Sequence, residues 1–290
     1  MKIIYLHQYF TTPGMSGGTR SYEMARRMVD AGHEVHMVTA RSDLDCASKD
    51  WEIETVSGIQ VHWLPVPYDN AMSYFRRLLA FTAFARKAGD YAARLNGDVV
   101  FATSTPLTIC IPGVKVSRKL GVPMVFEVRD LWPELPIAMG ALNFPFGKAV
   151  AKKLERWAYK NSARVVGLSP GMCEGVERAG FPAEKTVCIP NSSDVELFSV
   201  PDSEGHAFRA KREWLGTNKL VIYAGTFGRI NGVGALVDIA AEMKKLDSSV
   251  KFLAVGRGAE FDLVEEKARE KGVLGGNFFM EKAIPKSEIP

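Results

Sequence analysis

Two segments of the chain, far apart in the sequence, share one order: an apolar run, a glycine-rich loop and a helical pattern. The first run covers Ile3–His7 and precedes the loop 14–18; the second covers Leu220–Ala224 and precedes the loop 225–229. Such a unit puts backbone N–H groups and the positive end of a helix at the carboxyl edge of a buried strand, where they suit an anion such as phosphate. Two such units predict a ligand held between two domains.

Short apolar runs alternate with helical patterns along the chain, which is typical of parallel, doubly wound α/β sheets. The apolar runs predict strands over 2–7, 34–39, 60–64, 99–102, 123–128, 164–167 and 186–189, and then over 220–224, 251–255 and 277–281. The helical patterns cover 19–31, 74–96, 107–120, 148–161, 169–179, 233–246 and 259–271. The unbroken apolar character of the earlier runs indicates strands covered on both faces.

The length of 290 residues exceeds that of one average domain. The polar stretch 201–218 separates the two series of strands, so we predict a domain over 1–198 and a second one over 199–290. The second series supplies only half of a doubly wound sheet. We therefore expect these residues to be the amino-terminal part of a longer enzyme.

Composition excludes several classes of protein. A net charge of +4 is too small to favour nucleic acid as a partner. The four cysteines lack C-x-x-C spacing, and no secretory signal precedes the first strand, which together predict free thiols and a cytoplasmic location. The sequence holds no H-E-x-x-H, Walker or G-x-S-x-G motif, so zinc hydrolysis, P-loop ATPase and serine esterase chemistry are disfavoured. No apolar run reaches the roughly 20 residues of a membrane-spanning helix, and we expect no cofactor.

The segment 72–87 carries positive charge without any acid and also has an aromatic and leucine-rich face. Its basic residues are Arg76, Arg77, Arg86 and Lys87. This pattern suits a helix lying in an anionic membrane interface, although a core-facing helix with an ordinary polar side is slightly favoured. The segment 148–164 is also basic, with six basic residues against Glu155 alone.

The glycine loops are the first candidate binding site. Gly17 and Gly18 leave room for a ligand to approach the backbone, although a simple turn explains them equally well. The loop lacks the G-x-G-x-x-G order of a dinucleotide fold, which disfavours an NAD-dependent oxidoreductase. Arg229, just after Gly225 and Gly228, could neutralise a diphosphate through two hydrogen bonds.

Further candidates follow two of the predicted strands. His7 ends the first run, at the sheet edge where open α/β sheets bind ligands, although a lone histidine there is more often structural. Arg129, Asp130, Trp132 and Glu134 follow the run 123–128 and place charge and an aromatic ring at the same edge. A structural Arg129–Asp130 pair that caps the next helix is the alternative. Asp43 and Asp45 form a D-x-D pattern without a third ligand, so we predict no metal site.

Taken together, these motifs resemble the retaining glycosyltransferases of the GT-B fold, in the large family-4 group. The carriers of the resemblance are the segment 6–40, EVRDLWPELP from Glu127, LSPGMCEGV from Leu168, IPNSSDVELF from Ile189 and YAGTFGRINGVGALV from Tyr223. Within this group the chain is most similar to bacterial enzymes of O-antigen and capsule synthesis, including N-acetylfucosaminyl transferases.

The resemblance implies two Rossmann-like domains that face a cleft, the amino-terminal one taking the acceptor and the other the sugar nucleotide. It assigns Gly17, Gly18, Gly225 and Arg229 to the donor phosphates and transferred sugar. Asp194 matches an aspartate between the domains, near the nucleotide. Arg129 and Asp130 stand where members of the group often have His-Asp, and Asn231 follows the donor arginine where many have a lysine. The paired-glutamate stretch of the group would lie beyond Pro290.

The function that we expect is metal-independent, retaining transfer of a sugar from a nucleotide sugar, with UDP as the favoured nucleotide. Asp130 and Arg129 are the catalytic candidates, Asp130 for positioning only, whereas His7, Trp132 and Glu134 are candidates on the acceptor side. A lipid-linked saccharide acceptor at an anionic membrane surface would explain the basic helices. A nucleotide-sugar 2-epimerase and a non-catalytic acceptor-domain fragment or binding module stay open as alternatives.

Overall fold

The computed structural model describes residues 1–15, 17–41, 50–66, 74–140, 142–193 and 195–290, with only the backbone described for 74–78 and 286. The chain divides into two compact units. The first unit comprises Met1–Phe10 and Thr19–Ser192, and the second comprises Thr11–Gly18 and Ser193–Pro290.

The first unit is built on one eight-stranded sheet in the order β3-β4-β2-β1-β5-β6-β7-β8. Its strands are β1 (Lys2–Leu6), β2 (Glu34–Arg41), β3 (Glu52–Val56), β4 (Ile59–Pro65), β5 (Val99–Thr103), β6 (Met124–Val128), β7 (Arg164–Gly167) and β8 (Thr186–Cys188). All neighbours pair in parallel except β3, which runs antiparallel to β4. The parallel register brings the carboxyl ends of β1, β5 and β6 to one edge.

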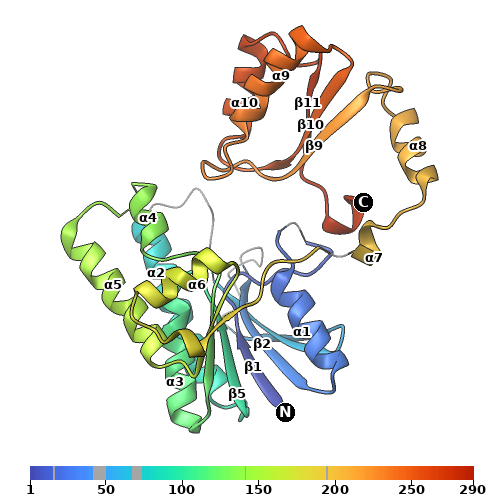
Figure 1. Ribbon diagram of the computed structural model, residues 1–290. Coiled ribbons are helices and arrows are strands. Elements are labelled where there is room, and N and C mark those ends of the chain that lie inside the picture. The colour runs from blue at the N-terminus through green and yellow to red at the C-terminus, as the bar shows by residue number, and fades with distance from the viewer. Residues whose placement is uncertain (16, 42–49, 67–73, 141, 194) are drawn as a thin grey trace. The chain divides into compact units, whose positions relative to one another are not determined.

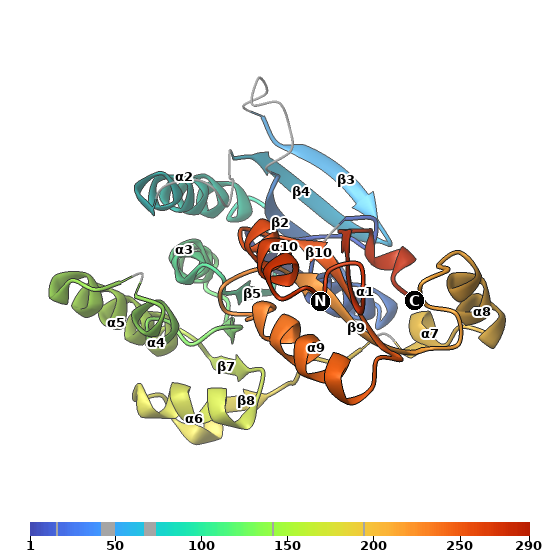
Figure 2. The ribbon, with the colours of Figure 1, turned by 90° about the horizontal axis from the view of Figure 1, so that it is seen from above.

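Helices cover both faces of this sheet, as the alternation of strand and helix predicts. Helix α1 (Arg20–Asp30) covers one face, and α2 (Tyr74–Ala92), α3 (Cys110–Leu120) and α5 (Pro145–Lys160) stand in a row along the other (Figures 1 and 2). Helix α6 (Pro170–Arg178) packs on β7 and β8, and the short α4 (Glu134–Ala138) precedes α5. The 3-10 turns η1 (Leu107–Ile109) and η2 (Ala183–Lys185) complete the unit.

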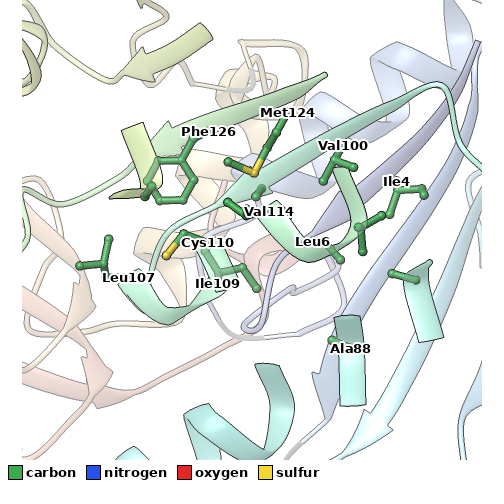
Figure 3. Close-up of a cluster of buried hydrophobic side chains, with 14 of the residues drawn as sticks. Ile4, Leu6, Ala88, Val100, Leu107, Ile109, Cys110, Val114, Met124 and Phe126 are labelled. Atoms are coloured by element: carbon green, nitrogen blue, oxygen red, sulfur yellow. The ribbon is translucent and has the colours of Figure 1, made fainter. Parts of the chain in front are cut away.

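The main hydrophobic core lies between the sheet and the row of helices. Ile4, Leu6 and Phe126 point from the strands toward Val114 and Cys110 of α3 (Figure 3). These side chains are all nearly or fully buried. The core therefore fixes the strand ends that carry the candidate site.

The second unit has a three-stranded parallel sheet in the order β11-β10-β9, formed by β9 (Lys219–Thr226), β10 (Val250–Arg257) and β11 (Phe278–Lys282). Helices α9 (Gly234–Leu246) and α10 (Phe261–Glu270) lie side by side on one face (Figure 1). The helices α7 (Val195–Phe198) and α8 (Asp202–Ala210) precede the sheet, and η3 (Lys286–Glu288) follows it. Phe227, Phe252 and Phe278 centre its core.

One expectation for this unit is wrong. The run that forms β9 was predicted as a buried strand, but Val221 is 40% exposed and Ile222 is 55% exposed. The physical reason is that β9 lies at an edge of the described sheet, where it pairs with β10 alone.

Candidate functional site

The carboxyl edge of the first sheet gathers polar side chains from three neighbouring strands. His7 follows β1, Ser104 follows β5, and Arg129 follows β6. Nη1 of Arg129 donates to Nε2 of His7 over 3.2 Å, and the backbone N–H of Arg129 donates to Oγ of Ser104 over 3.0 Å. The structure thus brings together two of the predicted site residues, His7 and Arg129, because β1, β5 and β6 are adjacent in the sheet.

The contact with Arg129 fixes the tautomer of His7. A guanidinium group can only donate, so Nε2 of His7 accepts and Nδ1 carries the hydrogen. Burial and then the positive charge of Arg129 hold the pKa of His7 well below its usual range. The ring is therefore a neutral imidazole near pH 7. Its Nδ1–H is buried and has no hydrogen-bond partner in the described part of the chain.

Gln8, the next residue, offers a second buried donor. Its side chain is 1% exposed, and Nε2 has no hydrogen-bond partner among the described residues. Its backbone oxygen is held by the N–H of Ala40 and the hydroxyl of Thr39. An unmet buried donor costs about 1–3 kcal/mol. Nδ1 of His7 and Nε2 of Gln8 are thus two buried donors at the carboxyl end of β1 that the described residues leave unmet.

Asp130 is held by Thr105 and not by Arg129, the partner that the helix-cap interpretation predicted. Oγ1 of Thr105 donates to Oδ2 of Asp130 over 2.8 Å. No Arg129–Asp130 ion pair is present among the described residues, because Arg129 turns to His7 instead. Helix α4 has Pro133 as its N-cap and no side-chain cap. The interpretation of the pair as a helix cap is therefore wrong.

Trp132 and Glu134 lie apart from this cluster. Trp132 packs against the main hydrophobic core, which accounts for its partial burial. Glu134 is exposed at the start of α4, and its Oε2 lies 3.9 Å from Nη2 of Arg178. Neither side chain hydrogen-bonds to His7 or Asp130 in the described part of the chain. Their proposed roles on the acceptor side stay predictions.

An ion pair that the sequence analysis missed involves Glu127 of β6, two residues before Arg129. Nη2 of Arg20 is 2.8 Å from Oε1 of Glu127, a carboxylate with no solvent exposure. Glu127 also accepts from the hydroxyl of Thr103 over 3.0 Å. Arg20 further donates to the backbone oxygens of Ile189 and Pro190, each over 2.9 Å. The signal in the sequence was an acidic residue within an otherwise apolar strand.

The first glycine loop has a conformation that requires glycine. Gly17 has a φ of 145°, and a Cβ there would lie 3.1 Å from Cγ2 of Thr11. The hydroxyl of Thr11 donates to the backbone oxygen of Gly18 over 2.8 Å. The side chain of Thr11 thus fixes the loop. Gly17 and Gly18 present only their backbone.

The second glycine loop is closer packed than the sequence indicated. A Cβ on Gly256 of β10 would overlap the backbone oxygen of Gly225, and one on Gly258 would overlap that of Phe227. Gly256 and Gly258 belong to this loop cluster but were not predicted; the signal was their G-x-G spacing at the end of an apolar run. Gly228 accepts from the N–H of Asn231 over 2.9 Å, which closes a turn before α9.

Arg229 lies exposed in this turn. Helix α9 begins after Val233, an N-cap residue with no side-chain cap. The N–H groups of Ala235 and Leu236 donate to the backbone oxygens of Gly232 and Val233, so the attraction of this helix end for an anion comes mainly from its dipole. A guanidinium and the positive end of a helix dipole within a few residues form an arrangement that suits a phosphate. That this loop and the loop around Gly17 serve one ligand stays a prediction.

Other predicted residues fall partly outside the described structure. Asp43, Asp45 and Asp194 lie outside the described residues, as do the side chains of Arg76 and Arg77.

The two remaining basic residues of that segment, Arg86 and Lys87, are exposed on α2, while Phe84 and Ala88 of the same helix are buried in the core. Within the described part of the chain, no three His, Cys, Asp or Glu side chains are grouped so that they could hold a metal ion. Likewise, none of the described helices is long and apolar enough to cross a membrane.

Comparison with known proteins places this geometry in a family. Residues 17–192 match the model of the glycosyl transferase 4-like domain. The chain belongs to this glycosyltransferase family. A protein of Pseudomonas aeruginosa named "Probable glycosyltransferase WbjE" is 25% identical over 208 residues, which cover 70% of this chain and 51% of that protein. The chain thus spans about half the length of the curated relative that it matches.

Solved structures agree with the family on the fold. Sucrose-phosphate synthase from Thermosynechococcus elongatus aligns with a TM-score of 0.76 at 17% identity, over 99% of this glycosyltransferase chain and 71% of the synthase. HepE from Anabaena, solved in complex with UDP and glucose, aligns with a TM-score of 0.66 at 17% identity, over 99% and 70% of the two chains. These likenesses confirm the predicted α/β architecture of the GT-B class.

Proposed function

We propose that this chain carries the acceptor-side domain and part of the donor-side domain of a retaining, metal-independent glycosyltransferase. The donor is a nucleotide sugar, with UDP as the nucleotide, and the acceptor is a lipid-linked saccharide of cell-surface polysaccharide synthesis. The functional division falls after residue 198, with the acceptor side in 1–198 and the donor side in 199–290.

The observation that carries this proposal is a pair of unmet buried donors at the carboxyl end of β1, on His7 beside Arg129 and on Gln8, the next residue. Nδ1–H of His7 and Nε2 of Gln8 are both buried, and both lack partners among the described residues. A saccharide offers many hydroxyl oxygens that can accept from such donors. Because His7 is neutral, it can donate to a sugar without repelling the cation-like sugar of the transition state.

The donor side is supported by charge. Departure of a nucleoside diphosphate builds negative charge on its oxygens, and preorganised donors aimed at that charge are worth a few kcal/mol each. Arg229 supplies such donors in the second unit, and the positive end of the α9 dipole follows it in the chain. Gly17, Gly18, Gly225 and Gly228 allow close backbone approach, and Asp194 stands near the nucleotide in this proposal.

The leaving phosphate oxygen takes the proton of the acceptor hydroxyl, whose oxygen forms the new bond to the anomeric carbon while the bond to the diphosphate breaks on the same face. Asp130 and Arg129 position the substrates. Thr105 holds Asp130 ready through its 2.8 Å hydrogen bond. HepE, a neighbour in fold, was solved with UDP and glucose, which is consistent with a UDP-sugar donor.

A membrane surface is the partner that a lipid-linked acceptor requires. Helix α5 and the residue before it expose Phe144, Phe146 and Val150, at 58%, 77% and 49%. Lys152 and Lys153 are exposed on the same helix. Aromatic side chains beside lysines suit an anionic bilayer interface, so α5 is a stronger candidate than α2 for peripheral binding at the inner face of the plasma membrane.

Two alternatives are tested by the same experiments. A 2-epimerase is not favoured, because the chain matches a glycosyltransferase family over residues 17–192. A non-catalytic fragment would bind a nucleotide sugar or a saccharide without transfer. The decisive experiment mixes a radiolabelled UDP-sugar with a lipid-linked saccharide and this chain, beside a version extended to the length of its relatives. Labelled lipid product with retained anomeric configuration supports the proposal, and its absence from both reactions overturns it.

A further inference from the structure

Two thiols flank Gly167 on one face of the first sheet, and the proposed sugar transfer uses neither. Gly167 ends β7, and Cys188 ends β8 as its register partner. Paired residues of neighbouring parallel strands direct their side chains to the same face. The side chain of Cys188 therefore stands beside the place where a side chain of residue 167 would stand.

Cys173 of α6 occupies that place. A Cβ on Gly167 would lie 2.7 Å from Sγ of Cys173 and 3.5 Å from its Cα. Only a residue without a side chain lets the first turn of α6 approach β7 this closely. The two thiols interact, and burial followed by the proximity of Cys188 raises the pKa of Cys173.

The backbone spacing suits a covalent bond between the two residues. Neighbouring strands lie about 4.8 Å apart, and α6 lies directly over Gly167. A disulfide needs its two Cα atoms to be roughly 4.4–6.8 Å apart, which this arrangement allows. A small molecule in solution can reach both thiols, because Cys188 is exposed and Cys173 is partly exposed.

We propose that Cys173 and Cys188 form a thiol–disulfide modification site that reacts with small disulfides such as oxidised glutathione. The thiolate of Cys188 attacks one sulfur of the small disulfide, and one small thiol leaves. The thiolate of Cys173 then attacks Sγ of Cys188 and expels the second small thiol. The protein loses two hydrogens, and the small disulfide is reduced to two thiols.

Formation of this disulfide would constrain the segment that follows β8. Ile189 and Pro190 follow Cys188 directly, and their backbone oxygens accept from Arg20. The disulfide would tie α6 to the strand from which this segment departs. The inference concerns the thiols alone and does not depend on the proposed sugar transfer.

The test uses the native chain with Cys46 replaced by Ser, incubated with oxidised glutathione, alkylated and mapped by mass spectrometry. We expect a peptide pair joined through Cys173 and Cys188, reversed by dithiothreitol. In the Cys173→Ser variant, the reaction should end with Cys188 in a mixed disulfide with glutathione. Cys110 serves as the internal control, because it is buried and burial raises its pKa to about 12.

Two results would overturn the inference. One is a stable mixed disulfide on Cys188 in the chain that keeps Cys173, with Cys173 still open to alkylation. The other is a Cys188 disulfide between two copies of the chain, visible as a dimer on a non-reducing gel.

Discussion

Arg20 and Glu127, 107 positions apart in the sequence, form an ion pair of 2.8 Å in which the carboxylate is fully buried. Removal of one partner leaves an uncompensated charge, which costs about 3–5 kcal/mol in such settings. We expect Arg20→Ala to lower the free energy of unfolding by that amount in urea denaturation. Arg27→Ala is the matched control, because Arg27 pairs with Glu23 on the helix surface and such pairs contribute less than about 1 kcal/mol. Equal effects of the two variants would contradict this account.

His62 makes the stability depend on pH. It is buried between Nδ1 of His36, 2.8 Å from its Nε2, and the hydroxyl of Tyr91, 2.9 Å from its Nδ1. Burial, followed by the charges of His36 and Lys2, lowers the pKa of His62 to about 4. The unfolded chain takes up a proton near pH 6.5 whereas the folded chain does not, so stability is lost as the pH falls from about 6.5 toward 4.

The slope is about 1.4 kcal/mol per pH unit for one such group, and His7 adds a contribution of the same sign. His62→Gln should therefore show a shallower loss of unfolding free energy between pH 7 and about pH 5 than the parent chain, whatever its stability at pH 7. Parallel pH profiles for the two proteins would refute the assignment.

The donor on His7 at the sheet edge predicts a loss of transfer activity when this residue is replaced. His7→Phe removes Nδ1–H, and we expect transfer in the radiolabel assay to fall by roughly 100-fold, as for loss of one preorganised donor. Glu184→Gln, an exposed change in η2, is the control for handling and folding. A His7→Phe protein that folds and keeps its full rate would remove His7 from the site.

The glycine cluster of the second unit predicts an asymmetry between two glycine-to-alanine changes. Gly256→Ala forces a Cβ onto the backbone oxygen of Gly225, so we expect a loss of at least about 1–3 kcal/mol in unfolding free energy. Gly205→Ala in α8 meets nothing within 4 Å and should gain about 0.5–1 kcal/mol. Thermal unfolding followed by circular dichroism measures both. A tolerated Gly256→Ala would show that the strands can separate there.

The membrane proposal predicts different effects of charge reversal on α5 and on α2. The double variant Lys152→Glu/Lys153→Glu reverses charge on α5, and Arg76→Glu/Arg77→Glu does so on α2. In flotation with vesicles that contain anionic phosphatidylserine, we expect the first pair to abolish binding and the second to weaken it less. If the parent chain itself stays at the bottom of the gradient, membrane contact is excluded for it.

Much of the fold was predictable because its strands are short, apolar and separated by helical patterns. The predicted strand 164–167 coincides with β7, and the other predicted strands differ from the observed ones by a few residues at most. β3 was missed because Glu52, Glu54 and Thr55 make it polar, which an antiparallel edge strand tolerates. α8 was missed because its residues 202–210 form no apolar stripe.

The site was predictable only in part. Strand ends could be identified from the sequence, so His7 and Arg129 were found together. Pairings between distant segments could not, since neither Arg20 nor Glu127 carries a local pattern that specifies its partner. The direction of a side chain was equally hidden: Trp132 follows the same strand as Arg129 but packs into the core.

The exposed edge of β9 has a practical consequence for handling the protein. Among the described residues β9 pairs on one side only and leaves Val221 and Ile222 open to water, which in this chain offers a template on which another copy can add a strand. Self-association should therefore rise with protein concentration, so dilute samples and a solubilising fusion partner suit biochemical work on this chain.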